Sequence, residues 1–221
     1  MPAIAIVGSG AGLGLSIAKV FGRHGFDVAL IARNEEKLGG FTARLATDGV
    51  KAVGFPADVT DPQALVGALN RAADQFGGID VLEFSVPPVD FVEALDVTVA
   101  NVRPQMECVC YGAITATQAV LPAMVAAGTG TLLFTTGASS VVPRAAFGSA
   151  GIAGAALRNW VLNLHEALGE KGVYVGHVAI GAWIEGTPAP AGVVTMHPDD
   201  IAAVYWNLYT TRDQAERLVT A

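Results

Sequence analysis

The segment of this sequence that is best suited to bind phosphate is a glycine-rich loop, VGSGAGLG, at residues 7–14. It lies between a short apolar stretch and a segment with helical spacing. Glycine allows positive φ angles and a close approach of the backbone to a pyrophosphate, and the following helix offers free N–H groups. The alternative is tight packing of strand and helix without a ligand. The pattern predicts a dinucleotide site formed by Gly8, Ser9, Gly10, Gly12, Leu13 and Gly14.

Arg33 stands at the position that would select between the two nicotinamide dinucleotides. It follows the second apolar strand, where an acidic residue usually accepts hydrogen bonds from the adenosine ribose. An arginine there suits a 2′-phosphate instead, so we expect NADP(H) to be favoured over NAD(H). The alternative is a surface arginine that pairs with Glu35 or Glu36.

The third strand ends in a further candidate for the nucleotide site, ADVTD at residues 57–61. Asp58 would accept a hydrogen bond from the adenine amino group, while the amide of Val59 donates to the ring. The alternative is a turn at Asp58, with Asp61 capping the next helix.

Strands and helices alternate along the chain that must position these loops. Apolar strands are predicted at 3–8, 27–33, 51–59, 79–86, 130–136 and 173–180, with a short seventh near 216–220. Helices are predicted at 12–25, 34–49, 61–77, roughly 92–127, roughly 145–169 and 197–211. Continuous apolar strands between amphipathic helices indicate a parallel sheet that is covered on both faces. We expect an α/β fold, a Rossmann-type doubly wound parallel sheet of six or seven strands, as a single domain over residues 1–221. The Pro/Gly-rich segment 185–192 would be a loop over a cleft or a plain connection.

Composition and charge exclude several classes of protein. Of 221 residues, 52% are hydrophobic and 15% charged, which argues against disorder. The net charge of −7 argues against a nucleic-acid or anionic-membrane partner. No signal peptide is recognised and no uninterrupted apolar run reaches about 18 residues, so no membrane span is expected. Cys108 and Cys110 are interpreted as ordinary thiols, and we expect a cytoplasmic protein.

With these segments in hand, the chain resembles a short-chain dehydrogenase/reductase over almost its full length. The resemblance rests on GSGAGLG (8–14), ARNEEKL (32–38), ADVTD (57–61), TQAVLPAM (117–124), GTLLFTTGASS (130–140) and HPDDIAAVYWNLY (197–209). It implies a nicotinamide cofactor, a small carbonyl or alcohol substrate, and a homodimer or homotetramer built through the two long helices. It also implies that the backbone of Ile184 holds the cofactor's carboxamide. Trp183 and Phe147 would line the substrate pocket, with core packing as the alternative for Trp183.

The four catalytic residues of that family are missing from the positions where the resemblance places them. Val109 stands for the asparagine, Gly137 for the serine, and Phe147 and Gly151 for the Tyr-x-x-x-Lys pair. In the family's mechanism the tyrosine exchanges a proton with the substrate oxygen, and a lysine one helical turn later lowers its pKa. Phenylalanine holds no exchangeable proton and glycine no charge, so neither can take this role.

Three weaker candidates would replace the missing proton donor. Ser139 and Ser140 follow the fifth strand, where ligands bind in such sheets, with loop hydrogen bonding as the alternative. Glu83 is a carboxylate near the end of an apolar strand, where burial would raise its pKa. It would face the cleft as an acid or base, or else be paired at the edge with an arginine or a backbone donor.

Three functions remain open. The first is an NADP(H)-dependent oxidoreductase whose proton comes from a substitute residue or from water. The second is a catalytically inactive NADP(H)-binding sensor or partner subunit, and the third a non-redox enzyme, such as a lyase, that reuses the cleft. The four histidines lack metal-ligand spacing, so no metal is expected.

Overall fold

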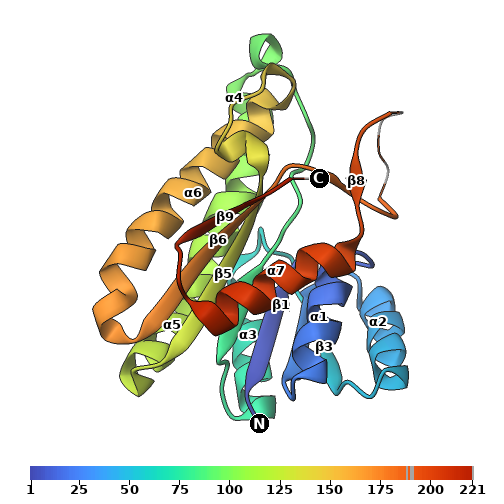
Figure 1. The fold of residues 1–221 in the computed structure, drawn as a ribbon, viewed down its shortest axis with the longest axis vertical. Helices are drawn as coiled ribbons and strands as arrows, with labels where there is room; N and C mark the ends of the chain where they lie inside the picture. The colour runs from blue at the N-terminus through green and yellow to red at the C-terminus, as the bar shows by residue number, and fades with distance from the viewer. Residues whose placement is uncertain (188, 190–191, 221) are drawn as a thin grey trace.

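The computed structural model describes residues 1–187, 189 and 192–220, and its centre is a seven-stranded parallel sheet. The strands are β1 (Ala3–Val7), β2 (Asp27–Ala32), β3 (Ala52–Pro56), β4 (Val81–Phe84), β5 (Gly130–Gly137), β6 (Val173–Ile180) and β9 (Glu216–Val219). Their order across the sheet is β3-β2-β1-β4-β5-β6-β9 (Figure 1). The predicted fold class is confirmed, including the short seventh strand. Of the loop expected at 185–192, residues 188, 190 and 191 lie outside the described residues.

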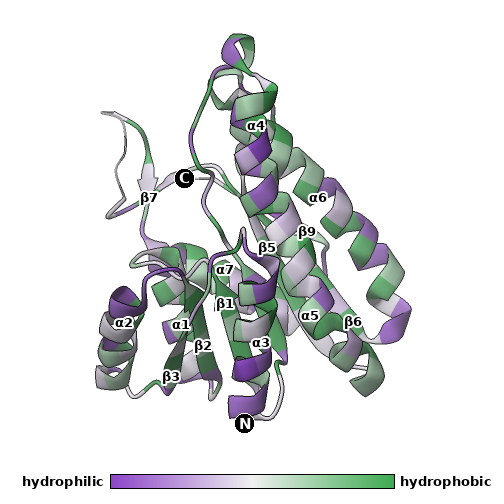
Figure 2. Cartoon of the chain, turned by 180° about the vertical axis from the view of Figure 1, so that it is seen from behind, coloured by the Kyte–Doolittle hydropathy of each residue, from purple (hydrophilic) through white to green (hydrophobic). Residues whose placement is uncertain are grey.

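Helices cover both faces of this sheet. They are α1 (Leu13–Arg23), α2 (Glu35–Thr47), α3 (Pro62–Phe76), α4 (Val99–Gln105), α5 (Gly112–Ala127), α6 (Gly148–Leu168) and α7 (Pro198–Thr211). Helices α1, α2 and α7 share one hydrophobic cluster with the sheet, and α3, α5 and α6 share the other. Figure 2 shows the apolar strands enclosed by helices, with hydrophilic residues on the outer sides of α2 and α3. Strands that are buried on both faces read as continuous apolar runs, which is why the pattern predicted this sheet.

Several boundaries differ from the prediction. The helix expected from roughly residue 92 begins at Val99, because Thr98 and Asn101 form a capping box there. The helix is interrupted by a π-helical turn, Met106–Tyr111, between α4 and α5. The strand expected to continue to residue 59 ends at Pro56, before a turn. A small second sheet, β7 (Trp183–Ile184) with β8 (Thr195–Met196), adds to the predicted elements.

The carboxyl ends of β1 and β4 mark the point where the strand order reverses. From β1 the chain proceeds outward through β2 and β3, whereas β4 begins the other half of the sheet on the opposite side of β1. Val7 of β1 is in register with Ile31 of β2 and Phe84 of β4. Open α/β sheets bind ligands in the crevice outside such a switch point. The fold therefore brings the glycine loop and the residues after β4 to one ligand-binding edge.

Candidate functional site

The glycine loop after β1 is held tightly against the end of β4. Gly8 has a φ of 93°, and a β-carbon there would lie 2.7 Å from the carbonyl oxygen of Ser85. At Gly14 a β-carbon would lie 3.0 Å from the Cα of Ser9. The amides of Gly8 and Ser9 both donate to the carbonyl of Ile31, at 3.0 and 3.1 Å. Only a residue without a β-carbon can follow this path at Gly8 without displacing the chain.

Helix α1 begins without a side chain that caps it. Its N-cap is Gly12, and its first turn contains no acidic residue. Side chains cap α2, α3, α4 and α7, namely those of Asn34, Asp61, Thr98 and His197, whereas α6 also begins without a side-chain cap. The first N–H groups of α1 therefore keep their capacity to bind an anion, with the helix dipole in its favour. The residues present fit a nucleotide pyrophosphate at this place.

Strand β7, which belongs to the small second sheet, approaches the same loop. A β-carbon at Gly12 would lie 3.4 Å from Cγ2 of Ile184. The structure thus places Ile184 beside the glycine loop, where the resemblance requires it. Its contact with the carboxamide of a nicotinamide stays a prediction.

Arg33 is exposed after β2 and forms no ion pair with another described residue. The alternative pairing with Glu35 or Glu36 is therefore not formed in this part of the chain. Asp58 accepts hydrogen bonds from the amide (2.9 Å) and the hydroxyl (2.8 Å) of Thr60. These bonds and, to a lesser extent, the charge of Arg33 hold the pKa of Asp58 below its usual value. The side chains of Arg33 and Asp58 therefore lie within electrostatic reach of each other.

The ADVTD segment forms a turn at Asp58, as the alternative interpretation predicted. Asp61 caps α3 by accepting hydrogen bonds from the amides of Gln63 and Ala64, both at 3.0 Å. The adenine contacts assigned to Asp58 and Val59 stay predictions beside this turn.

Two of the four positions of the missing catalytic residues, Gly137 and Gly151, lie beside Ser139. Gly137 ends β5 and Gly151 lies in the first turn of α6, and β-carbons there would lie 3.7 and 3.9 Å from Ser139 Oγ. Phe147 directly precedes α6, and Val109 is buried in the π-helical turn. Such turns within helices occur frequently at functional sites. The four positions themselves supply no hydroxyl, phenol or amine group. The hydroxyl group of Ser139 lies next to two of them.

Ser140 begins a chain of buried hydrogen bonds that the sequence pattern did not reveal. Its Oγ lies 2.7 Å from Oγ1 of Thr136, which lies 2.9 Å from Nε2 of His177. Nδ1 of His177 lies 2.9 Å from Oε2 of Glu216, whose carboxylate is held by both Nε and Nη2 of Arg158. Burial lowers the pKa of His177, against the opposing effect of the Glu216 carboxylate. The one feature of the sequence that could have indicated this hydrogen-bond chain is His177, a histidine within an apolar strand.

Ser140 is itself buried, whereas Ser139 is half-buried. The hydrogen bonding that was the alternative for these serines is therefore what the structure shows at Ser140. Of the two, Ser139 is the more accessible to a ligand.

Glu83 is fully buried and does not face the cleft, which corrects the prediction. Strand β4 places its side chain on the face covered by α1 and α7, in register with Ile6 of β1. Its carboxylate accepts hydrogen bonds from Ser85 Oγ at 2.9 Å and from Thr135 Oγ1 at 3.0 Å. Thr135 Oγ1 in turn lies 2.6 Å from the hydroxyl of Tyr205. Burial raises the pKa of Glu83 to about 8, in the expected direction, although its described partners are hydroxyl groups rather than an arginine or a backbone donor.

Three aromatic rings meet at the start of α6. The ring of Phe91 lies 5.2 Å from that of Phe147 and 5.5 Å from that of Trp183, both edge to face. The fully buried side chain of Gln105 holds this loop in place by donating to the carbonyl of Asp90 at 2.8 Å. Phe147 and Trp183, the predicted pocket residues, are thus joined by a ring that the sequence pattern did not single out.

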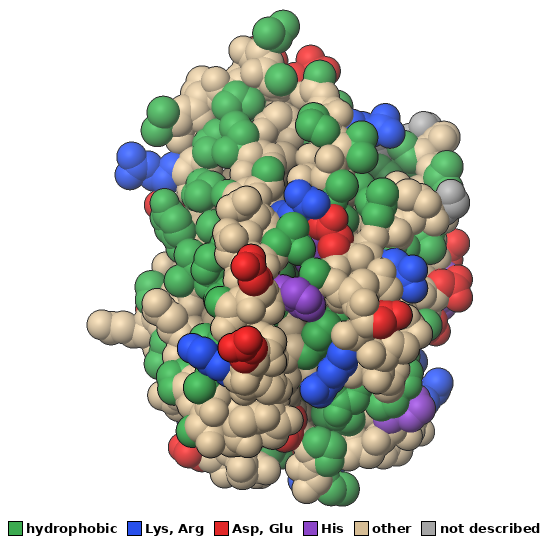
Figure 3. Space-filling view, turned by 60° about the vertical axis from the view of Figure 1, so that its left-hand side comes forward, with side chains coloured by type: hydrophobic (Ala, Val, Ile, Leu, Met, Phe, Trp, Pro, Cys, Tyr) green, Lys and Arg blue, Asp and Glu red, His purple; other side chains and the backbone are tan. Residues whose placement is uncertain are grey.

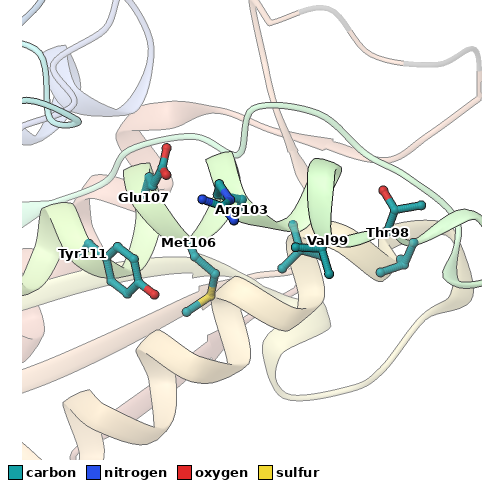
Figure 4. Close-up of a pocket in the computed structure, with 8 residues that line it drawn as sticks. Thr98, Val99, Arg103, Met106, Glu107 and Tyr111 are labelled. Carbon is teal, nitrogen blue, oxygen red and sulfur yellow. The ribbon is translucent and has the colours of Figure 1, made fainter.

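A groove of about 660 Å³ runs along the outer side of α4 and the π-helical turn. Its lining consists of Val97, Thr98, Val99, Val102, Arg103, Met106, Glu107 and Tyr111 (Figure 4). Val99 and Tyr111 are exposed, as is Ile152 on α6. Figure 3 shows further hydrophobic side chains on the upper part of the neighbouring face. Exposed apolar surface of this kind marks a site of interaction.

One helix, Val99–Ala127, is long and apolar enough to cross a membrane by length and composition alone. Half of its most apolar window is buried inside the fold, as in the core helix of a globular domain. Arg103 and Glu107 interrupt its apolar run. In the part of the chain that the structure describes, no three His, Cys, Asp or Glu side chains gather as a metal site would need.

Comparison with known proteins gives matches over most of the chain. A family model described as short chain dehydrogenase matches residues 2–190. An uncharacterized oxidoreductase of Staphylococcus aureus (strain MRSA252) is 28% identical over 200 residues, which cover 89% of this chain and 86% of that protein. Other curated relatives are matched over less of their length. The aligned region covers 54% of an oxidoreductase from strain USA300 and 10% of the glycine betaine reductase of Emericella nidulans.

Solved structures share the fold over the whole chain. A short-chain dehydrogenase from Rhodopseudomonas palustris is 25% identical with a TM-score of 0.86, over 100% of this chain and 98% of that one. L-Sorbose reductase from Gluconobacter frateurii, solved with NADPH and L-sorbose, is 19% identical with a TM-score of 0.86. That alignment covers 99% of this chain and 94% of the reductase, and at this identity it shows likeness of fold alone.

Proposed function

Since this chain belongs to the short-chain dehydrogenase family of oxidoreductases, we propose that it uses NADP(H) to interconvert a small carbonyl compound and its alcohol. The observation that carries the proposal is the uncapped N-terminus of α1 behind the glycine loop. Arg33, which forms no ion pair in the described part of the chain, supports NADP(H) over NAD(H) because a 2′-phosphate would neutralise it. NADP(H), when bound, supplies or accepts the hydride.

Each part of the nucleotide has candidate partners on this chain. The backbone of the glycine loop and the first turn of α1 would bind the pyrophosphate, and Arg33 the 2′-phosphate. Asp58 and Val59 would contact the adenine, and the backbone of Ile184 the carboxamide. The substrate would then contact the rings of Phe147 and Trp183.

The proton must come from a group other than Phe147. Ser139 is the accessible hydroxyl beside Gly137 and Gly151, and it would hydrogen-bond a substrate oxygen while water supplies the proton. An alcohol is a poor acid at neutral pH, so we expect slow turnover compared with an enzyme that holds a positioned acid.

A second function, an inactive NADP(H)-binding sensor or partner subunit, is favoured by one observation. The rings of Phe147 and Trp183 both pack edge to face against Phe91, which occupies part of the place expected for a substrate. Such a protein would bind the nucleotide without oxidising or reducing any carbonyl or alcohol.

We also infer that a second copy of this chain covers the groove along α4. Members of the family often form oligomers, and the groove carries apolar side chains together with one arginine and one glutamate. A patch that carries both charges suits a two-fold contact between two copies. In such a contact Arg103 of each copy would face Glu107 of the other copy. Replacing exposed Tyr111 by Glu should convert a dimer to a monomer in analytical ultracentrifugation, and an unchanged mass would contradict this interface.

Both cysteines, Cys108 and Cys110, are buried free thiols, and burial raises the pKa of each. Thiols kept in this form are compatible with a reducing, cytoplasmic location, which we propose for the protein.

The test of the proposed function is a calorimetric titration with NADPH and, in parallel, with NADH. We expect a Kd of about a micromolar for NADPH and weaker binding of NADH. Binding of neither would contradict the proposal. Binding of NADPH without turnover of any carbonyl or alcohol in a broad panel would favour the inactive sensor or partner subunit.

A further inference from the structure

The carboxyl group of Glu83 belongs to a chain of hydrogen-bonded side chains whose other members carry hydroxyl groups. This chain runs from the core toward the ligand-binding edge. Ser85, Glu83, Thr135 and Tyr205 are joined in this order by hydrogen bonds of 2.9, 3.0 and 2.6 Å. Tyr205 and Glu83 are fully buried, whereas Ser85 is half-buried just after β4. Ser85 is thus the end of the chain that can reach a ligand.

The number of hydrogens in this chain depends on the charge of Glu83. When Glu83 is ionised, three hydroxyl hydrogens fill the three bonds, and Ser85 turns only lone pairs outward. When Glu83 is protonated, four hydrogens serve three bonds, so one hydrogen must point out of the chain. At Tyr205 that hydrogen would be buried without an acceptor, which is costly. At Ser85, which is only half-buried, it can point outward to an acceptor on a ligand.

Ser85 lies against the glycine loop at the switch point of the sheet. Its amide donates to the carbonyl of Val7 at 2.9 Å, and its own carbonyl blocks a β-carbon at Gly8. A nucleotide bound by the glycine loop would therefore lie near the backbone of Ser85, whose half-buried side chain belongs to the same segment.

We propose that Ser85 donates a hydrogen bond to an oxygen of the bound nucleotide, and that Glu83 must be protonated for it to do so. This inference rests on the proposed binding of NADP(H). Ionisation of Glu83 weakens binding because it turns the hydrogen of Ser85 inward, toward the carboxylate.

The surroundings of Glu83 leave the nucleotide as the main charge that acts on it. Tyr205 of α7 is the titratable group that faces it, and β1 and β5 present Ile6 and Leu133 in register. Within the described residues no charged side chain contributes to the pKa of Glu83. A pH dependence of nucleotide binding near pH 8 would therefore originate at this carboxyl group.

The experiment is calorimetric titration of the full chain with NADPH at pH 8, in two buffers that differ in ionisation enthalpy. The difference between the buffers measures the protons taken up on binding. For the unmodified protein we expect uptake of about half a proton at pH 8, and an affinity that falls up to about tenfold per pH unit above it. E83Q should bind without uptake and with similar affinity at pH 6.5 and 9, because its amide can still donate to Ser85. S85A should lose the uptake and bind severalfold more weakly, whereas E93Q, an exposed glutamate on the loop after β4, should match the unmodified protein.

Each contrary outcome has a separate meaning. NADPH binding without proton uptake, and with equal affinity at pH 6.5 and 9, overturns the inference and leaves the proposed function intact. Uptake that persists in S85A overturns the role of Ser85, because Glu83 would then act through its charge alone. If NADPH does not bind at any pH, the proposed function itself is overturned.

Discussion

The hydroxyl oxygen of Ser139 lies 3.9 Å from the position that a β-carbon would take at Gly151. This is an ordinary van der Waals separation, and the carbonyl oxygen of Ser139 would lie at the same distance of 3.9 Å. A longer side chain can therefore enter at Gly151 without displacing the backbone. Phe147 lies four residues earlier, at the N-cap of α6, so a tyrosine and a lysine at these two positions would restore the spacing of the family's Tyr-x-x-x-Lys pair.

The double variant F147Y/G151K should gain carbonyl reductase activity. A positioned acid is typically worth about 10²–10⁴ in rate, so we expect a gain of at least about a hundredfold in NADPH oxidation with small aldehydes and ketones. F147Y/G151A is the matched control, because it supplies the phenol without the amine. If the double variant binds NADPH but shows no gain, the substrate pocket itself differs from that of the family.

Arg33→Asp should reverse the preference between the two dinucleotides. The carboxylate repels a 2′-phosphate but accepts hydrogen bonds from a free ribose, so we expect NADPH binding to weaken by at least tenfold while NADH binding is unchanged or improved. Calorimetry with both ligands checks this. Arg44→Asp, an equal change of charge on exposed α2, should leave the ratio unaltered. Equal losses for both ligands in Arg33→Asp would show that Arg33 does not contact the 2′-phosphate.

Gly8→Ala should destabilise the protein much more than Gly10→Ala. At Gly8 the substitution combines a φ of 93° with a β-carbon 2.7 Å from Ser85, and we expect a loss on the order of 2–4 kcal/mol in the free energy of unfolding. At Gly10 the nearest atom would be 3.9 Å away, so little change is expected. Chemical denaturation of the two variants measures the difference, and equal stability would contradict the close contact with Ser85.

The raised pKa of Glu83 should make the protein less stable as the pH rises. The pKa of Glu83 is about 8 in the folded chain, whereas the ordinary pKa of a glutamate is 4.5, so the folded state binds more protons between these two values. Stability should therefore be greatest below about pH 4.5 with respect to this group, and should decline up to about pH 8 by an amount on the order of a few kcal/mol. E83Q should lack this decline and be more stable than the unmodified protein at pH 9. A pH dependence that is identical in E83Q would assign the decline to other groups.

The ion pair of Glu216 with Arg158 and His177 should act in the opposite direction. Its partners lower the pKa of Glu216, and burial lowers that of His177, so the unfolded chain binds more protons than the folded chain in acid. The stability that these groups contribute should be lost as the pH falls from about 6.5 through the folded pKa values. E216Q should cost about 1–3 kcal/mol at pH 7 and flatten the acid side of the profile, as measured by denaturation at pH 5 and 7. D48N, which removes the pair with Lys19, is the control and should change little, because no buried histidine shares that carboxylate; a similar loss in both variants would contradict a special role for Glu216.

The sequence was sufficient for the architecture because the strands are apolar on both faces. A parallel sheet covered by helices on both sides is the arrangement that buries such runs, and the glycine loop then falls at the end of β1. The boundary at Val99 was missed because the capping box of Thr98 lies within a segment that is apolar enough to read as helix.

The buried polar contacts could not be predicted because their partners are distant in the sequence. His177 and Glu216 belong to neighbouring strands, β6 and β9, and the second of these is short and charged. Glu83 is linked to Tyr205 through Thr135, because α7 in the crossover between β6 and β9 brings Tyr205 to this part of the sheet. Phe91 joins Phe147 and Trp183 through a loop that a buried glutamine holds, and no periodic pattern indicates such a loop.

The strand order has a consequence for how the chain acquires its structure. Every pair of neighbouring strands in the large sheet is parallel, so no two of them can form a hairpin, and each pairing waits for an intervening crossover. The central strands β1 and β4 are separated in the sequence by β2, β3 and three helices, so they pair only across this long connection. Chains with so few local contacts fold slowly and expose unpaired strand edges while they do so. Recovery from denaturant should therefore be best in dilute solution, where collisions between partly folded chains are rare.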